Sequence, residues 1–415
     1  MYRTCVIARL CFTAVTLFFL AAPAAAEVIP FDDERWDLES AEIVSHLERQ
    51  SLIGVAVLED LEFENGVIEF DIAVSGARSY PGVIFRMQSD KDYERFYFRP
   101  HRAGLYPDAL QYVPSINGIA GWQLYHGEGF TAGAEIPENR WIHLKLEVRG
   151  SQARVWLEDV AEPALVIDEL KHGLSRGGLG LLGPADGTAH FSNFSYRSDD
   201  SLTFEEPQEQ TTPPGTLTNW QLSRSYKTAQ VNRDRYPLFF QLFAAGWREI
   251  TSEPAGLVDV ARYSGREGRE ADCVFARTVF EAERNERVKL SFGYSDEVTI
   301  FHNGRPVFFG NSAYRSRDRS FVGVVGLHDT LYLDLTRGLN EIFLIVSERF
   351  GGWGFIVQAD RELKVPTKRH ELLSKVWETP DHFLTPESVL YDPARQWERS
   401  LASRLQRVLA HHVHG

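Results

Sequence analysis

The stretch from Val288 to Gly310, VKLSFGYSDEVTIFHNGRPVFFG, constrains the fold more than any other part of the chain. Apolar and polar side chains alternate on either side of two short turns, and a period of two is typical of strands with one buried face. The second turn contains Asn303-Gly304, a pair that tolerates the positive φ angles of a tight hairpin. The stretch therefore predicts three consecutive antiparallel strands.

The same alternation recurs along most of the chain, and no segment before the C-terminal end has a convincing helical pattern. The predicted strands, besides those of the stretch above, are 62–74, 82–87, 93–101, 109–113, 121–125, 141–148, 153–158, 177–183, 190–196, 246–250, 256–263, 273–280, 330–335, 340–348 and 353–360. Many short strands at regular spacing are typical of sandwiches. We predict an all-β fold of two antiparallel β-sandwiches, or jelly rolls, in tandem, followed by a short, partly helical C-terminal tail.

The N-terminal segment has the pattern of a secretory signal peptide. Arg3 and Arg9 precede and flank an apolar stretch, and a run of small residues ends at Ala26. A retained membrane anchor is the alternative, although the apolar stretch is short for a span. We expect a secreted or periplasmic protein. The predicted parts are a signal peptide at 1–26, a sandwich at 27–200, an acidic, Pro-rich linker at 201–216, a second sandwich at 217–362 and a tail at 363–415.

Charge and cysteine content restrict the partners. Removal of residues 1–26 takes away two arginines and no acidic residue, so the formal charge falls from −14 to −16. Such a chain is a poor candidate for binding nucleic acid or anionic membranes, and no later segment is long and apolar enough to span a membrane. Cys273 alone remains, so no internal disulfide forms. Its strand-like surroundings favour a buried, inert thiol over a nucleophile.

The segment Tyr93 to His101, YERFYFRPH, carries the strongest indication of a binding site. Its period of two places Phe96 and Phe98 on one face and a mixed row of polar and aromatic side chains on the other. We predict a shared contact surface made of Arg86, Tyr97, Arg99, His101, Gln111 and Tyr125, with Trp122 as an alternative at its edge. Planar donors and aromatic faces suit the hydroxyls and C–H faces of sugars.

An alternative interpretation of this row needs no ligand. Arg99 can pair with Glu94 or Asp108 in a ladder of cross-strand contacts, which stabilises a sheet modestly. Both interpretations stay open. The first requires that the row faces a common hollow.

The order of seven segments resembles a concanavalin A-like jelly roll: 65–72, 82–86, 93–101, 141–148, 153–159, 177–183 and 190–196. The resemblance is close to laminin-G-type domains and to the 3-keto-disaccharide hydrolase or family-16-like domain of secreted bacterial proteins. This architecture occurs in lectins, hydrolases and adhesion modules. Family-16 glucanases carry Glu-x-Asp-x-(x)-Glu on one strand, and Glu69-Phe70-Asp71 gives the opening half. The closing acid is missing, which leaves Glu94 and His101 as weak candidates for proton transfer.

The segments 288–308 and 334–355 resemble the galactose-binding-like jelly roll that is appended to many secreted glycosidases. Trp353, which lies between glycines, is then either a loop-borne sugar contact or a core residue. Calcium often supports such jelly rolls. Its candidate ligands are Asp296, Glu297, Asp318 and Asp329, although no calcium-loop pattern is present and no metal is assigned.

Residues 376–396 resemble the first strand of a propeller of the gluconolactonase or senescence-marker-protein type, without the repeated blades that such a fold needs. From these observations together we predict a carbohydrate- or polysaccharide-binding protein. One alternative is a glycosidase-like hydrolase of a sugar or 3-keto-disaccharide. A second alternative is an adhesion or scaffold module without catalytic activity.

Overall fold

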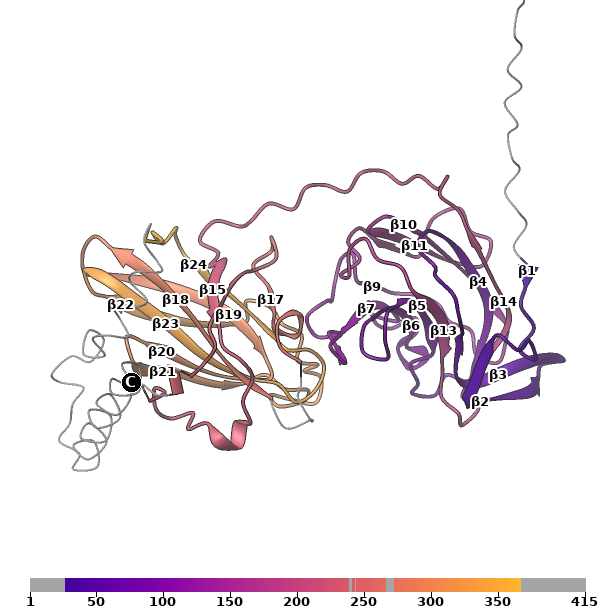
Figure 1. Ribbon diagram of the computed structural model, residues 1–415, viewed down its shortest axis with the longest axis horizontal. Coiled ribbons are helices and arrows are strands. Elements are labelled where there is room, and N and C mark those ends of the chain that lie inside the picture. Colours follow the sequence, from indigo (N-terminus) through magenta and orange to yellow (C-terminus); the bar gives the residue numbers. More distant parts are fainter. Residues whose placement is uncertain (1–26, 239–240, 243, 266–271, 367–415) are drawn as a thin grey trace, which may run out of the picture.

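The computed structural model describes residues 27–238, 241–242, 244–265 and 272–366 (Figure 1). Within these ranges the regular structure is almost entirely strand, and no helical segment is long and apolar enough to cross a membrane. The expected all-β fold of antiparallel sheets is confirmed. The predictions for the signal peptide and for nearly all of the tail concern residues 1–26 and 367–415, which lie outside the described residues.

The first fourteen strands belong to one hydrogen-bonded sheet with the path β12-β11-β10-β4-β14-β3-β13-β5-β6-β7-β8. Its strands are β1 (Glu27–Val28), β2 (Trp36–His46), β3 (Arg49–Leu58), β4 (Gly66–Val74), β5 (Gly82–Met87), β6 (Tyr93–Phe98), β7 (Leu110–Ile116), β8 (Ile119–Ala120), β9 (Thr131–Ala132), β10 (Ile142–Arg149), β11 (Gln152–Leu157), β12 (Leu165–Ile167), β13 (Gly178–Leu182) and β14 (Ala189–Ser198). We call this unit the N-terminal sandwich.

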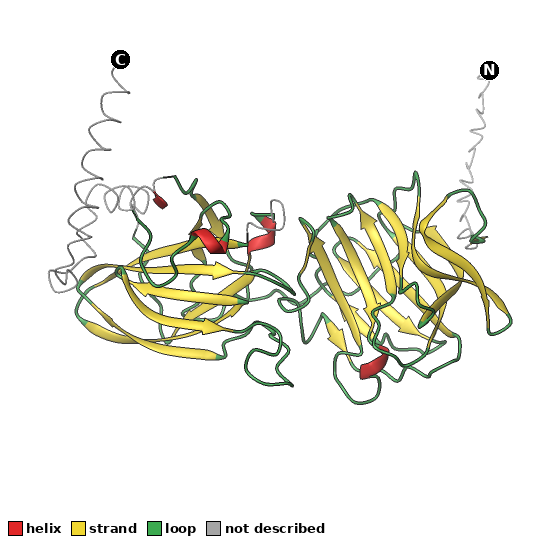
Figure 2. Ribbon diagram, turned by 90° about the horizontal axis from the view of Figure 1, so that it is seen from below, coloured by secondary structure: helices red, strands yellow, loops and turns green. Residues whose placement is uncertain are grey.

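The sheet of the N-terminal sandwich curls until its two halves face each other. A single apolar cluster contains Phe70 of β4 and Leu144 of β10 from one half, and Phe85 of β5 and Phe96 of β6 from the other. These side chains occupy alternate positions along their strands, so the burial of one face of each half drives the closure. Figure 2 shows the N-terminal sandwich beside the second sandwich.

Three local predictions for this unit are corrected. Residues 121–125 form turns instead of a strand. Strand β6 ends at Phe98, because Pro100 has no amide hydrogen for the ladder and begins a 3₁₀ turn, η1 (Pro100–Arg102). Strands β2 and β3 were not predicted; they pair with each other over most of their lengths, and β3 also pairs with β13 and β14.

The second unit, which we call the C-terminal sandwich, contains two sheets ordered β16-β15-β18-β23-β20-β21 and β17-β24-β19-β22. Its strands are β15 (Asn219–Leu222), β16 (Arg248–Thr251), β17 (Val258–Asp259), β18 (Cys273–Ala282), β19 (Glu286–Ser295), β20 (Glu297–His302), β21 (Arg305–Asn311), β22 (Asp329–Leu335), β23 (Gly338–Ser347) and β24 (Gly354–Ala359). Two further 3₁₀ turns are η2 (Thr228–Gln230) and η3 (Val260–Arg262).

The meander predicted at 288–310 is confirmed in its strands and in its second turn. Asn303 and Gly304 have φ angles of 49° and 77°, as a tight hairpin between β20 and β21 requires. The first turn differs from the prediction because β19 and β20 belong to different sheets. The chain therefore crosses the sandwich there. Cys273 is buried as expected, and burial raises the pKa of its thiol to about 12.

The two sandwiches are joined through residues 116–125, which we call the junction segment. Ile116 and Ile119 belong to the apolar core of the C-terminal sandwich. The backbone of Gln123 donates to Gly351 O and accepts from Val325 N, both at 2.8 Å. The buried amide of Gln123 donates to Val322 O at 2.7 Å and accepts from the Ser295 hydroxyl at 3.0 Å. Through its backbone and its side chain together, Gln123 thus connects three segments of the second unit.

Candidate functional site

The polar row that was predicted on β6 forms, but it is buried. Tyr97 lies opposite Gln111 of β7, and its hydroxyl donates to Gln111 Oε1 at 2.7 Å. Arg99 donates to the same oxygen and, at 2.9 Å, to the Tyr97 hydroxyl. The amide of Gln111 donates to the carbonyls of Trp122 and Tyr125. These three predicted contact residues are brought together, yet each exposes at most 5% of its surface.

Asp108 completes this network from beneath. It forms an ion pair with Arg99 at 2.5 Å and another with Arg102. Burial pushes the pKa of Asp108 upward, but the His126 imidazole, 3.8 Å away, and the two guanidiniums outweigh burial and lower it to about 2. The pairing of Arg99 with Asp108, which was the alternative interpretation of the row, is confirmed. The row is therefore a support and not an open contact surface.

Arg86 does not join the row, which corrects the prediction. Its φ angle is 51°, next to an irregularity in the pairing of β5 with β13. The fully buried guanidinium donates to the carbonyls of Glu64, Gly150 and Gly173 at 2.7 to 3.0 Å. Because its donors are committed to backbone carbonyls, Arg86 ties loops together.

Glu94 and His101, the weak catalytic candidates, do not share a site. Glu94 is buried on the core face of β6, where it accepts hydrogen bonds from the Tyr112 hydroxyl at 2.6 Å and from His172 N at 2.9 Å. His101 lies in η1, and its ring packs edge-on against Tyr80 at 5.6 Å between centroids. No hydrogen-bond partner for the buried Nδ1 of His101 occurs among the described residues. Because Glu94 is buried, it has no access to a ligand.

Four aromatic rings lie together above the buried row, and we call them the aromatic surface: Tyr80, Trp122, Tyr314 and Phe350. Trp122 contacts Tyr314 and Phe350 edge-on, with centroids 6.2 and 5.8 Å apart. Tyr80 and Phe350 expose 37% and 61% of their surfaces. The rings come from loops of both sandwiches, so the junction positions them.

Arginine side chains connect the aromatic surface to its support. Arg78 donates to the hydroxyls of Tyr80 at 2.9 Å and Tyr314 at 3.3 Å. Arg99 lies beneath Trp122, with its guanidinium carbon 5.5 Å from the ring centroid. Trp122 was named from the sequence as an edge residue. Tyr80, Tyr314 and Phe350 were not predicted, because no local sequence pattern relates three loops so far apart in the chain.

Trp353 and Tyr125, the remaining predicted contacts, are buried elsewhere. Trp353 is fully buried in the core of the C-terminal sandwich, and its indole nitrogen donates to Val346 O at 3.3 Å. Its core interpretation is therefore correct. Gly351 and Gly352 beside it pack against Gln123 and Leu124 of the junction segment and do not form an open loop. Tyr125 lies in the junction, where its hydroxyl contacts two carboxylates.

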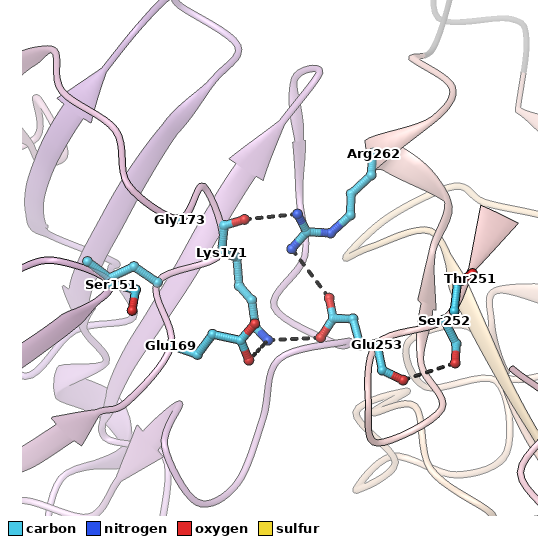
Figure 3. A pocket seen from close by; sticks show the side chains of 9 residues that line it. Ser151, Glu169, Lys171, Gly173, Thr251, Ser252, Glu253 and Arg262 are labelled. Atoms are coloured by element: carbon cyan, nitrogen blue, oxygen red, sulfur yellow. Dashed lines mark hydrogen bonds and ion pairs between the residues drawn. The ribbon is translucent and has the colours of Figure 1, made fainter. Parts of the chain in front are cut away.

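A pocket of about 400 Å³ lies between the sandwiches beside Tyr125 (Figure 3). It is lined by Ser151, Glu169, Leu170, Lys171, Gly173, Thr251, Ser252, Glu253 and Arg262. The ammonium of Lys171 forms ion pairs with Glu169 at 2.7 Å and with Glu253 at 2.8 Å. The two carboxylate oxygens are thus separated by at most the sum of these distances, about 5.5 Å. Arg262 donates to the carbonyl of Lys171 at 2.9 Å.

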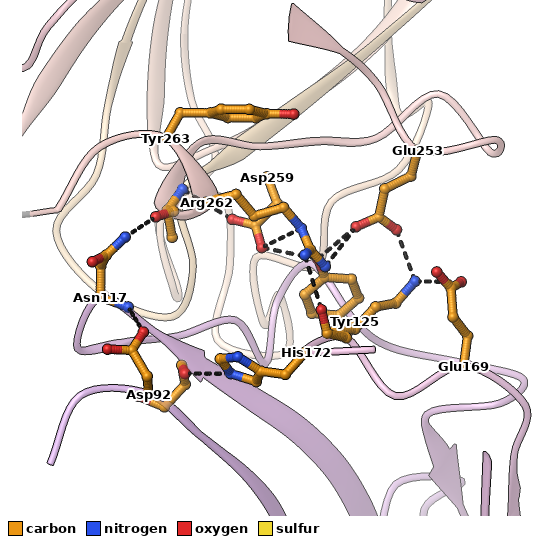
Figure 4. Close-up of polar contacts among 12 residues, drawn as sticks. Asp92, Asn117, Tyr125, Glu169, His172, Glu253, Asp259, Arg262 and Tyr263 are labelled. Carbon is orange, nitrogen blue, oxygen red and sulfur yellow. Dashed lines mark hydrogen bonds and ion pairs between the residues drawn. The ribbon is translucent and has the colours of Figure 1, made fainter. Parts of the chain in front are cut away.

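Glu253, which lines this pocket, also belongs to a cluster of polar contacts with Tyr125, Asp259 and Arg262 (Figure 4). The Tyr125 hydroxyl lies 2.7 Å from Glu253 and 2.9 Å from Asp259. A hydroxyl has one proton and can donate it to only one of the two carboxylates at full strength. Burial raises the pKa of Asp259 to about 6, although Arg262 and the Tyr125 hydroxyl act against this shift. A protonated Asp259 would donate to Tyr125 and satisfy the cluster.

The pocket carboxylates are arranged for ion pairing. A retaining glycosidase has two carboxyl groups about 5 to 5.5 Å apart, one of which must carry a proton for the leaving group. Lys171 lies between Glu169 and Glu253 and forms an ion pair with each. A separation of at most about 5.5 Å allows the spacing of the hydrolase alternative, whereas the bridging ammonium opposes it.

The acidic residues that were named for calcium have protein partners. Asp296 accepts from Arg349 N and Phe350 N, and Asp318 accepts from Ser320 N and Phe321 N. Glu297 pairs with Arg233, and Asp329 pairs with Arg317. In the described part of the chain, no three His, Cys, Asp or Glu residues lie close enough together to hold a metal ion.

No protein-family model and no curated protein matches the chain. The chain is similar to solved structures that include a carbohydrate binding module, CBM66, from Bacillus subtilis, with 22% identity over 40% of this chain and 96% of that one and a TM-score of 0.32. A protein with a galectin-like fold from the same organism has 12% identity over 39% and 89%, with a TM-score of 0.29. Chicken galectin 2 has 12% identity over 33% and 95%, with a TM-score of 0.26. Similarities at this level carry no argument about what the chain binds.

Proposed function

We propose that this protein is a secreted or periplasmic carbohydrate-binding protein, and that its contact region is the aromatic surface. The observation that carries the proposal is the grouping of Tyr80, Trp122, Tyr314 and Phe350 around the exposed Arg78. Aromatic faces cover the C–H side of a sugar ring, and an adjacent guanidinium donates to its oxygens. Loops from both sandwiches supply these groups.

The buried row gives this surface its rigidity. Tyr97, Gln111 and Asp108 hold Arg99 in place, and Arg99 in turn lies beneath Trp122. A contact residue that is already held in position loses little conformational freedom when a ligand binds. The role of the predicted row is therefore indirect: it orients the ring above it.

Binding to a panel of immobilised glycans and polysaccharides tests the proposal. Phe350→Ala and Tyr80→Ala should each weaken binding roughly fivefold, because an aromatic contact contributes about 1 kcal/mol beyond its buried area. Tyr332→Ala is the matched control, since Tyr332 is 65% exposed on β22 and has no part in the aromatic surface. Equal binding by all three variants and the unaltered protein would exclude the aromatic surface.

The hydrolase alternative rests on one observation, the presence in one pocket of Glu169 and Glu253, whose Lys171-bound oxygens are at most about 5.5 Å apart. Its test is the release of reducing ends from any polysaccharide that binds. Hydrolysis that disappears in Glu169→Gln, while binding to the same polysaccharide persists, would support it. An adhesion or scaffold role without sugar recognition predicts that no glycan binds.

A further inference from the structure

The aromatic surface carries positive charge that the protein itself does not neutralise. Arg78 is exposed, and its hydrogen bonds go to the uncharged hydroxyls of Tyr80 and Tyr314. Arg315 is exposed, and its guanidinium carbon lies 4.9 Å from the centroid of the Tyr314 ring. Within the described ranges neither arginine has a carboxylate at ion-pair distance, while Asp318 nearby is occupied by the backbone of Ser320 and Phe321.

A third guanidinium extends this charge beneath the rings. Arg95 lies 4.6 Å from the centroid of Tyr97 and donates to the carbonyl of Tyr80, and its buried Nε has no partner in the described structure. Elsewhere most arginines pair with acids, as Arg287 does with Asp334 and Arg154 does with Asp168. Within the described ranges, Arg78, Arg95 and Arg315 thus bring three guanidiniums without a carboxylate partner to one surface of a chain whose formal charge is −14.

The rings hold these cations in defined positions. Arg78 bridges two tyrosine hydroxyls, and Arg315 stacks on one of the same rings. Guanidinium groups bind carboxylates and sulfates through two parallel hydrogen bonds, which a neutral hydroxyl cannot match in strength. Stacking on an aromatic face orients the fork before the ligand arrives.

We infer that the ligand of the aromatic surface is an acidic glycan, a chain of uronate or sulfated sugars whose anionic groups contact Arg78 and Arg315. This inference rests on the proposed function and adds the chemical class of the sugar. The pyranose ring packs against the exposed aromatic faces while its anionic group meets the guanidiniums. A neutral glycan would leave those cations without a counter-charge.

The pKa of His101 provides an independent measure of the charge on Arg78 and its neighbours. Burial lowers the pKa of His101, and the guanidiniums of Arg78, Arg102 and Arg99 lower it further, against the opposing effect of Asp108. An anion bound beside Arg78 offsets the positive field, so the His101 pKa should rise on binding. A neutral sugar does not change the field in this way.

Titration calorimetry with polygalacturonate and with its fully methyl-esterified form tests the inference, because esterification removes the charge of each carboxylate and leaves the sugar rings and their linkages unchanged. Binding of the acid form should be at least tenfold tighter and should weaken with added salt. Arg78→Gln should weaken it roughly tenfold or more, since a hydrogen bond between charged groups contributes about 1.5 to 3 kcal/mol. Arg284→Gln, at an exposed arginine paired with Glu286, is the control.

The outcomes separate the two proposals. Equal affinity for both forms, unchanged in Arg78→Gln, would overturn the acidic-glycan inference and leave carbohydrate binding standing. If neither these chains nor a panel of sulfated and neutral polysaccharides binds, the proposed function itself fails. NMR titration of His101 gives a second reading: a pKa that rises with the acid form supports the inference, and an unchanged pKa in the bound protein contradicts it.

Discussion

The hydroxyl of Tyr125, in the junction segment of one sandwich, lies 2.9 Å from the carboxylate of Asp259 in the other. Glu253 lies 2.7 Å from the same hydroxyl on its other side, and Lys171 and Arg262 are paired with Glu253. The two sandwiches are thus connected by a hydroxyl that faces two carboxylates. Its hydrogen bonds depend on where the protons are, so the stability of the junction should depend on pH.

The pKa of Asp259 in the folded protein is about 6, above its ordinary value of 3.8. The folded state therefore holds this proton more tightly than the unfolded state does. The associated stability is fully present below about pH 3.8 and is lost as the pH rises through about 6, and it amounts to at most about 3 kcal/mol. Asp259→Asn should remove this dependence and be more stable than the unaltered protein at pH 7. Melting temperatures of both proteins from pH 4 to 8 measure the difference.

Tyr125→Phe removes the shared donor. Glu253 and Asp259 then face each other without the hydroxyl, and an unsatisfied buried carboxylate costs about 1 to 3 kcal/mol. We expect a lower urea midpoint at pH 7 and a smaller loss at pH 4, where Asp259 is more often protonated. A loss of the same size at both pH values would show that the hydroxyl does not act through proton sharing.

Arg99→Ala should destabilise the protein before it affects any ligand. It leaves the carboxylate of Asp108 buried with only Arg102 and His126 as partners, and breaking a buried ion pair costs about 3 to 5 kcal/mol. Phe350→Ala, at the exposed surface, should change stability by less than about 0.5 kcal/mol. Denaturation curves of the two variants distinguish the buried row from the exposed aromatic surface. Equal stability of the two variants would contradict the assignment of Arg99 to the buried row.

Gly351→Ala tests the close approach between the sandwiches. A Cβ atom at Gly351 would lie 2.3 Å from the Gln123 side chain, whereas one at Gly338 would meet nothing within 4 Å. Both glycines have positive φ, 103° and 98°, so the backbone strain is similar and only the collision differs. Gly351→Ala should cost about 1 to 3 kcal/mol more than Gly338→Ala. Equal melting temperatures of the two variants would mean that the junction accommodates the added methyl group without losing stability.

Much of the fold follows from local pattern. The period of two located β4, β5, β10, β14 and most strands of the C-terminal sandwich, and Asn303-Gly304 located a hairpin. Strand β2 was missed because its mixed burial gives no clear alternation. The aromatic run at 121–125 was misread as a strand, because a segment buried between two units has the composition of a strand without its pairing.

Only part of the candidate site could be predicted from the sequence. Alternation along β6 correctly grouped Tyr97 with Arg99, and pairing with β7 added Gln111. Alternation could not show that loops cover this face of β6. It also could not show that the positive φ of Arg86 turns its side chain away from the row and toward the carbonyls of neighbouring loops. The aromatic surface depends on contacts of Trp122 with Tyr314 and Phe350, which lie 192 and 228 positions further along the chain, and period and propensity do not encode such contacts. The division of the chain into parts and the export signal stay predictions.

The central claim is tested most directly by isothermal titration calorimetry with a polysaccharide that binds in the glycan panel. The polysaccharide is titrated into the unaltered protein and into the double variant Tyr80→Ala/Phe350→Ala. We predict saturable binding to the unaltered protein and to Tyr332→Ala, and roughly 25-fold weaker binding to the double variant at unchanged melting temperature, because two aromatic contacts are lost. Equal affinity of the double variant and the unaltered protein would contradict the claim that sugars bind at the aromatic surface.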